Sequence, residues 1–258
     1  MKTQRHAARA RVAAAGVVAG VLLAGCGAAN ESAPAGGGAP SAAGTALSGT
    51  ISGAGASSQQ AAMQAWIAGF TGANPDATVN YDPAGSGAGR TQFLAGGVAF
   101  AGSDAYLKAD ELTKGQQRCG GDVVEVPAYV SPIAVVYNVQ GVTDLQLAPA
   151  TVAGVFLGKI TNWNAPEIAA DNPGKTLPDQ AITPVHRSDE SGTTQNFTDY
   201  LNKAAGDVWT EKAAGTWPVQ GGEAAQGTSG VIGAVQGGNG TIGSVSYTHL
   251  TLPTILRV

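Results

Sequence analysis

The sequence repeats a unit of strand, glycine-rich turn and helix three times, and this order limits the fold more than any other feature. A short strand pattern at residues 50–52 runs into four small residues, and residues 57–70 then carry apolar side chains at helical spacing. Residues 78–95 and 182–205 repeat the unit. Strands that alternate with helices predict an α/β architecture with largely parallel sheets.

A long β-branched and aromatic run at residues 125–139 is interrupted by Pro127 and Pro132. Proline cannot donate a hydrogen bond to a sheet, so we expect this run to carry the chain from one domain to another instead of forming one central strand. Residues 151–157 predict a short helix, and residues 158–164 form a turn-rich segment.

The N-terminus resembles a bacterial export signal. Basic residues are followed by an apolar run at residues 12–23, which is too short to span a bilayer. The run ends in Leu23-Ala24-Gly25-Cys26, which resembles the lipobox of bacterial lipoproteins. We therefore predict a signal peptide at residues 1–25, a lipid on Cys26 and a flexible Ala/Gly/Ser linker at residues 26–48. The alternative is a soluble secreted chain with an incidental cysteine.

The mature chain is acidic. The first 25 residues hold four of the fourteen Lys and Arg and none of the eighteen Asp and Glu, so removing them leaves a net charge of −8. Because no basic stripe is available to neutralise a phosphate backbone, nucleic acid is excluded as a partner. Any anion that the chain binds must be held by local geometry and not by overall charge.

Each repeated unit places hydroxyl and glycine residues where a helix begins. The first amides of a helix have no internal acceptor, and the helix dipole adds partial positive charge there, so these turns favour anion binding. The turns contain Ser57 and Ser58, Ser86, and Ser191-Gly192-Thr193, the last with Arg187 four residues before it. For any one of these turns, simple helix capping is the alternative.

Four segments resemble the phosphate loops of the periplasmic phosphate-binding proteins, the PstS family. The order and spacing match, and further similarity at residues 157–164, 217–218 and 240–243 extends the resemblance over residues 50–243. The segments are Gly53-Ala54-Gly55-Ala56-Ser57-Ser58, Tyr81-Asp82-Pro83-Ala84-Gly85-Ser86-Gly87-Ala88-Gly89, Phe100-Ala101-Gly102-Ser103-Asp104 and Arg187-Ser188-Asp189-Glu190-Ser191-Gly192-Thr193.

The resemblance implies eight phosphate-binding residues and no metal or cofactor. Asp189 would hold the arginine in place, and Ser58 would contribute only its backbone amide. The family more often has threonine and then an aromatic residue at positions 57 and 58, and often an acid at position 99, where this chain has alanine. The implied ligands are Ser57, Ser58, Ser86, Asp104, Arg187, Ser191, Gly192 and Thr193.

The fold implied by the resemblance is a two-lobed, type II periplasmic-binding-protein fold, each lobe a mixed sheet flanked by helices. The first lobe would comprise residues 49–130 and the second residues 131–243. The implied function is high-affinity binding of inorganic phosphate outside the cell membrane and its delivery to an ABC-type permease and its ATPase. The protein would be a lipid-anchored monomer and not an enzyme.

Other functions remain open at this point. A receptor for sulfate or molybdate on the same scaffold is one alternative, but sulfate carries no proton to share with Asp104 at neutral pH. A surface phosphate sensor without transport is another. Enzyme readings find little support, because residues 84–88 lack the outer glycines of a nucleophile elbow and residues 154–159 are one residue short of a nucleotide P-loop.

The last residues, 244–258, resemble nothing in the family. We interpret them as a non-native tail, produced by a sequencing or assembly artefact on a truncated gene, so that the fold would be incomplete at its C-terminus. Resequencing the locus tests this interpretation.

Overall fold

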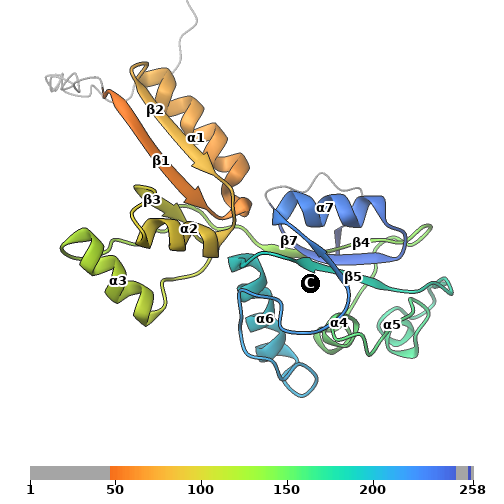
Figure 1. Cartoon of the computed structure of the whole chain (residues 1–258). Coiled ribbons are helices and arrows are strands. Elements are labelled where there is room, and N and C mark those ends of the chain that lie inside the picture. The colour runs from red at the N-terminus through yellow and green to blue at the C-terminus, as the bar shows by residue number, and fades with distance from the viewer. Residues whose placement is uncertain (1–46, 248–254, 257–258) are drawn as a thin grey trace, which may run out of the picture. The chain divides into compact units, whose positions relative to one another are not determined.

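The computed structural model describes residues 47–247 and 255–256 (Figure 1). The predicted signal peptide, the predicted lipid-attachment residue Cys26 and nearly all of the predicted linker at residues 26–48 lie outside the described residues, as do residues 248–254 and 257–258. No helix in the described part of the chain is long and apolar enough to cross a membrane.

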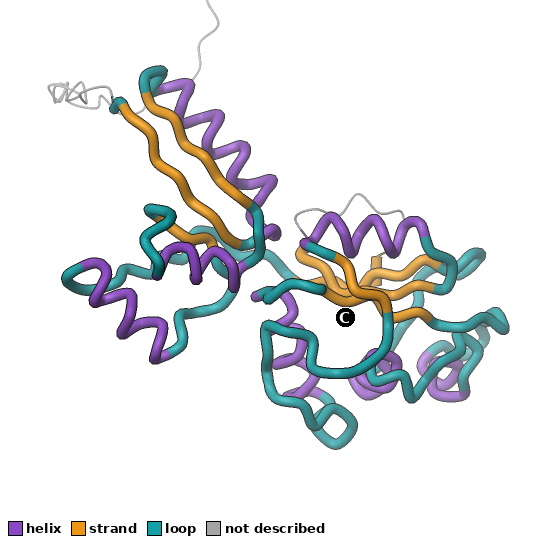
Figure 2. The backbone as a smooth tube through the Cα atoms, viewed as in Figure 1, coloured by secondary structure: helices purple, strands orange, loops and turns teal. Residues whose placement is uncertain are grey.

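The first sheet is parallel, with three strands in the order β2 (Ala77–Asp82), β1 (Gly49–Gly55) and β3 (Phe100–Gly102). Parallel neighbours need crossover connections, and helices supply them (Figure 2). The helices of this part are the 3₁₀ turn η1 (Ser57–Gln59), α1 (Gln60–Ala73), α2 (Ser86–Leu94) and α3 (Ala109–Cys119).

Helix α2 lies on β1 with backbone against backbone. A Cβ atom added to Gly89 would lie 2.4 Å from the Cα of Gly55 and 2.6 Å from the carbonyl oxygen of Ala54. A Cβ on Gly55 would in turn lie 2.0 Å from the carbonyl oxygen of Gly102 in β3. Only glycine permits these approaches, so α2 lies directly on the end of β1, and the end of β1 lies directly against β3.

The second sheet is mixed, in the order β6-β5-β7-β4-β8. Strand β5 pairs in parallel with β6 and β7, whereas β4 pairs antiparallel with β7 and β8. The strands are β4 (Ile133–Asn138), β5 (Thr183–Arg187), β6 (Glu223–Ala225), β7 (Thr241–Ser246) and β8 (Ile255–Leu256). The helices are α4 (Pro149–Phe156), α5 (Pro166–Asp171), α6 (Gly192–Ala204) and α7 (Gly227–Gly237).

The described hydrophobic core gathers on the two faces of this second sheet. Alternate residues of β4 divide between them: Val135 and Tyr137 join the larger cluster, with Trp163 and Trp209, and Val136 joins a smaller one beneath α7. The first sheet is less covered. Strand β1 is buried only toward its carboxyl end, and α1 has no buried residue. Burial in this part is therefore concentrated where the strands end.

The structure agrees with the predicted α/β fold and differs in details. The described strands of the first sheet pair only in parallel, so mixed pairing occurs in the second sheet alone. Of the run at residues 125–139, only residues 133–138 form a strand, which begins directly after Pro132. Strand β7 continues to Ser246, so the first three residues of the predicted tail pair with β4 and have buried side chains.

Candidate anion-binding site

The predicted ligand residues follow the carboxyl ends of four strands. The loops after β1, β2 and β3 carry Ser57, Ser86 and Asp104, and because these strands are parallel their carboxyl ends meet at one edge. The fourth loop follows β5, where Arg187 is the last strand residue. In open α/β sheets, ligands bind outside the carboxyl ends of the strands.

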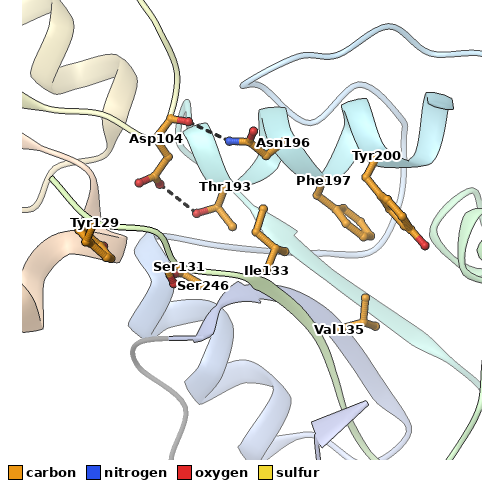
Figure 3. Close-up of a pocket in the computed structure, with 10 residues that line it drawn as sticks. All are labelled: Asp104, Tyr129, Ser131, Ile133, Val135, Thr193, Asn196, Phe197, Tyr200 and Ser246. Carbon is orange, nitrogen blue, oxygen red and sulfur yellow. Dashed lines mark hydrogen bonds between the residues drawn. The ribbon is translucent and has the colours of Figure 1, made fainter. Parts of the chain in front are cut away.

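Asp104 is the residue at which these loops meet. The Ser58 hydroxyl is 2.7 Å from both carboxylate oxygens and donates to them, and the Thr193 hydroxyl donates to Oδ2 at 3.2 Å (Figure 3). The Asp104 amide donates to the Ser86 hydroxyl at 3.3 Å. The Ser58 side chain therefore has a contact beyond the backbone role predicted for this position.

Helix α6 approaches Asp104 through its first residue, Gly192. A Cβ there would lie 2.6 Å from the Cβ of Asp104, so the contact requires glycine. Asn196, one turn later, donates to the carbonyl oxygens of both Asp104 and Gly192 at 2.8 Å (Figure 3). The N-terminus of α6 is thus fastened to the loop after β3.

Arg187 is buried, with 5% of its surface exposed, and Asp189 orients it. The guanidinium donates through Nε to Asp189 Oδ1 at 2.7 Å and through Nη2 to Oδ2. Burial raises the pKa of Asp189, but the hydrogen bonds from Arg187 and the Gly227 amide, with the charge of Arg187, lower that pKa below its ordinary value overall. The carboxylate therefore remains charged and holds the guanidinium in one orientation.

Ser57 meets a residue that the sequence did not single out. Its hydroxyl oxygen accepts from the Thr228 amide at 3.0 Å and lies 3.1 Å from the Thr228 hydroxyl. Both side chains are almost fully buried. The sequence gives little sign of Thr228, because no charged residue lies within three positions of Gly227-Thr228.

Simple capping, the alternative to anion binding, applies to Ser191 alone among the predicted hydroxyls. Its side chain accepts from the Thr194 amide at 3.3 Å, as an N-cap does. The residues that precede η1 and α2, Ala56 and Gly85, provide no side-chain cap. The Ser57 and Ser86 hydroxyls therefore have other partners than their own helices.

Comparison with known proteins places the chain in a family. A family model described as a PBP superfamily domain matches residues 40–253. The phosphate-binding protein PstS 3 of Mycobacterium tuberculosis is 38% identical, over 99% of this chain and 70% of that protein. PstS 2 of the same organism is 36% identical, over 96% of this chain and 66% of that protein. The chain belongs to the PstS family.

Solved structures agree with this PstS-family assignment. A high-affinity periplasmic phosphate-binding protein solved with bound phosphate gives a TM-score of 0.61 at 28% identity, over 76% of this chain and 56% of that one. A phosphate-binding protein from Stenotrophomonas maltophilia gives a TM-score of 0.63 at 23% identity, over 81% and 64%, which supports the fold alone.

An ion cluster in this PstS-family protein joins the second and fourth loops, and the sequence did not reveal it. Arg90 in α2 is 3% exposed and donates to Glu190 at 2.8 Å and to both carboxylate oxygens of Glu111 at 3.2 Å. Exposed Lys108 adds a longer contact to Glu190 at 3.4 Å. The Gly87 amide also donates to the Glu190 carbonyl oxygen at 3.1 Å.

A cavity of about 470 Å³ opens beside Asp104 (Figure 3). Its polar end contains Asp104 and Thr193, the two predicted ligand residues among its lining residues. Its other lining residues are Tyr129, Ser131, Ile133, Val135, Asn196, Phe197, Tyr200 and Ser246. Two of the eight predicted ligand residues therefore border this cavity, while the other six, Ser57, Ser58, Ser86, Arg187, Ser191 and Gly192, lie outside its lining.

Within the described residues, no group of three or more His, Cys, Asp and Glu side chains is placed to hold a metal ion. His186 stacks on Trp217, with 5.1 Å between ring centroids, and Cys119 is exposed at the end of α3.

Proposed function

We propose that this protein binds inorganic phosphate outside the cell membrane and delivers it to an ABC-type phosphate permease and its ATPase. The observation that carries the proposal is the meeting of four loops at the Asp104 carboxyl residue, one of which begins at buried Arg187, in a chain of the PstS family. The eight predicted residues, Ser57, Ser58, Ser86, Asp104, Arg187, Ser191, Gly192 and Thr193, are the proposed ligands.

Arg187 supplies the positive charge in this proposal. A guanidinium has five N–H donors, and Asp189 accepts from Nε and from one N–H of Nη2. The three remaining N–H groups have no acceptor among the described residues, and they can be given to phosphate oxygens in parallel. Hydroxyls and helix-terminal amides of the other loops complete the donor set.

Asp104 supplies an acceptor. An ionised carboxylate accepts about four hydrogen bonds, and the Ser58 and Thr193 hydroxyls provide two protons between them. Capacity therefore remains for a proton carried by the ligand, which phosphate retains across the neutral range. This argument favours phosphate over fully ionised sulfate.

The lipid on Cys26, the monomeric state and the absence of catalysis belong to the same proposal. The lipid is supported by the lipobox-like sequence at residues 23–26, and the absence of catalysis by the names of the relatives, which are binding proteins. Mass determination of the purified chain tests the lipid.

The first test is calorimetric titration of the full chain, purified in mild detergent, with phosphate, sulfate and molybdate. We expect phosphate alone to bind tightly. Arg187→Gln removes charge-assisted hydrogen bonds and should weaken phosphate binding by roughly 100-fold. Lys212→Gln, which removes the same charge from an exposed position, is the matched control and should bind as the unmodified chain does. Equal affinities for Arg187→Gln and the control would contradict the proposal, as would tighter binding of sulfate.

A further inference from the structure

The first turn of α7 contacts two of the proposed ligand loops at once. The Thr228 amide and hydroxyl meet the Ser57 hydroxyl at 3.0 and 3.1 Å, and the Gly227 amide donates to Asp189 Oδ1 at 3.0 Å. Asp189 in turn holds Arg187. The turn thus contacts one proposed ligand, Ser57, directly, and it contacts Asp189, which supports a second, Arg187.

Thr228 does not use its hydroxyl to cap its own helix. The N-cap of α7 is Gln226, whose own side chain makes no capping hydrogen bond, and the first two amides of the helix donate instead to Asp189 and Ser57. Thr228 is 1% exposed and Ser57 is 4% exposed, so water does not compete for the contact between their hydroxyls. Gly227 has a φ of +68°, and a Cβ there would lie 3.7 Å from the Ser57 side chain. The backbone at this turn therefore brings Thr228 close to Ser57.

The contact with Thr228 determines which group can receive the Ser57 hydroxyl proton. A serine hydroxyl has one proton and two lone pairs. The Thr228 amide fills one lone pair. If the Thr228 hydroxyl donates, the second lone pair is filled and the Ser57 proton can only be given to a third group. If Ser57 donates to Thr228, its proton is occupied and cannot reach an anion.

We propose that Thr228 is a positioning residue for phosphate, which turns the Ser57 hydroxyl proton toward the bound anion. This inference rests on the proposed function, with Ser57 as a ligand. When phosphate is bound, the Thr228 hydroxyl donates to Ser57 and Ser57 donates to a phosphate oxygen. Without phosphate, either direction of the Ser57–Thr228 bond is allowed, so ligand binding selects one direction without moving the two oxygen atoms.

The test compares Thr228→Val, which keeps the shape and the amide but removes the hydroxyl, with the full chain by phosphate titration. We expect affinity to fall roughly 5- to 10-fold, the usual effect of one neutral hydrogen bond. Thr228→Ser should restore affinity to within about 2-fold. In the Ser57→Ala background, Thr228→Val should have no further effect on affinity, because the hydroxyl that it orients is gone.

Thr241→Val is the matched control. Thr241 is 3% exposed, and its hydroxyl donates to the Val235 carbonyl oxygen at 2.9 Å, near the other end of α7. Its loss should lower the melting temperature and leave phosphate affinity unchanged. Melting temperatures of all variants without phosphate identify any that fail to fold, and Thr228→Ala then replaces Thr228→Val.

Three results would overturn the inference. The first is an unchanged phosphate affinity in Thr228→Val while the unmodified chain binds phosphate. The second is full additivity of the losses of binding free energy caused by Ser57→Ala and Thr228→Val. The third, no phosphate binding by the unmodified chain, overturns the proposed function as well and is thereby distinguished from the other two.

Discussion

At the scale of single residues, the site depends on hydroxyl groups whose single proton has two acceptors within reach. Ser58 offers one proton to two carboxylate oxygens of Asp104, each at 2.7 Å. Ser57 has a similar choice between Thr228 and a ligand. A carboxylate cannot donate, so the direction of every bond to Asp104 is fixed, whereas the direction at Ser57 depends on what is bound.

Replacing Asp104 by Asn should reduce the discrimination between phosphate and sulfate. The amide can turn its NH₂ group toward either anion, while its oxygen still accepts from Ser58. A site that depends on one specific hydrogen bond rejects the analogue lacking it by roughly 10⁴-fold, and most of this factor should disappear in Asp104→Asn while phosphate binding weakens only moderately.

Competition titration of phosphate at low and high sulfate measures the effect of Asp104→Asn. Asp122→Asn, at an exposed position, is the control. A variant that keeps the full preference for phosphate would assign Asp104 a purely structural role.

At the residue scale, the sequence points to loops in which glycine and hydroxyl residues lie together after a strand, and their role as phosphate ligands stays a prediction. The loops with Ser86 and with Ser191-Gly192 were recognisable from these turn residues, and the structure brings both to Asp104. Asn196 could have been found from its position one helical turn after Gly192, on the same face of α6. The contacts of Thr228 with Ser57 and of Arg90 with Glu190 could not be found in this way, because the partners lie 171 and 100 residues apart in the sequence.

At the scale of elements, α2 and the loop between β5 and α6 are joined by Arg90 and Glu190. Arg90 also binds Glu111 in α3, so one buried guanidinium touches three elements of the chain. Buried charges cost free energy unless they are paired. The pair therefore disfavours any arrangement in which α2 and this loop separate and leave Arg90 with Glu111 as its one described carboxylate partner.

Glu190→Gln should destabilise the protein by about 1–2 kcal/mol, less than a fully buried pair because Glu190 is 38% exposed. Lys108→Gln breaks only a longer contact of an exposed lysine to the same carboxylate and should cost little. Urea unfolding at low and high salt measures both variants. Equal losses of unfolding free energy in Glu190→Gln and Lys108→Gln would show that the contact of Glu190 with buried Arg90 stabilises the protein no more than its contact with exposed Lys108 does.

The helices that the sequence predicts are present, but α3, α5 and α7 are not among them. The helices expected near residues 57–70, 151–157 and 193–205 are present with shifted ends, and the first begins as a 3₁₀ turn in which Ser57 and Ser58 are buried. Within residues 125–139, which the sequence predicts to connect two domains, only residues 133–138 form a strand, and pairing starts directly after Pro132.

At the scale of the whole molecule, stability should depend on pH through Asp189. The lowered pKa of this carboxyl means that its ionised form is stabilised by folding. This contribution is complete above the pKa of the unfolded chain, about 4, and is lost as pH falls through the lower pKa of the folded state. Asp189→Asn should therefore lose stability at pH 7 and lose less than the unmodified chain on acidification.

Urea unfolding at pH values between 7 and 3 tests this dependence on Asp189. Asp199→Asn removes a carboxylate that pairs with exposed Lys203 and serves as the control. A slope of unfolding free energy against pH that is the same in Asp189→Asn and in the unmodified chain would contradict the assignment.

The glycine contacts between α2 and β1 also have a mechanical consequence. Side chains usually form a deformable layer between a helix and a sheet, but Gly89 and Gly55 leave no such layer. A displacement of β1 along its own direction must therefore move the first turn of α2 by the same amount. Ser57, just after β1, and Ser86, at the start of α2, should therefore move together as one rigid unit. The distance between them is kept whenever that part of the chain moves.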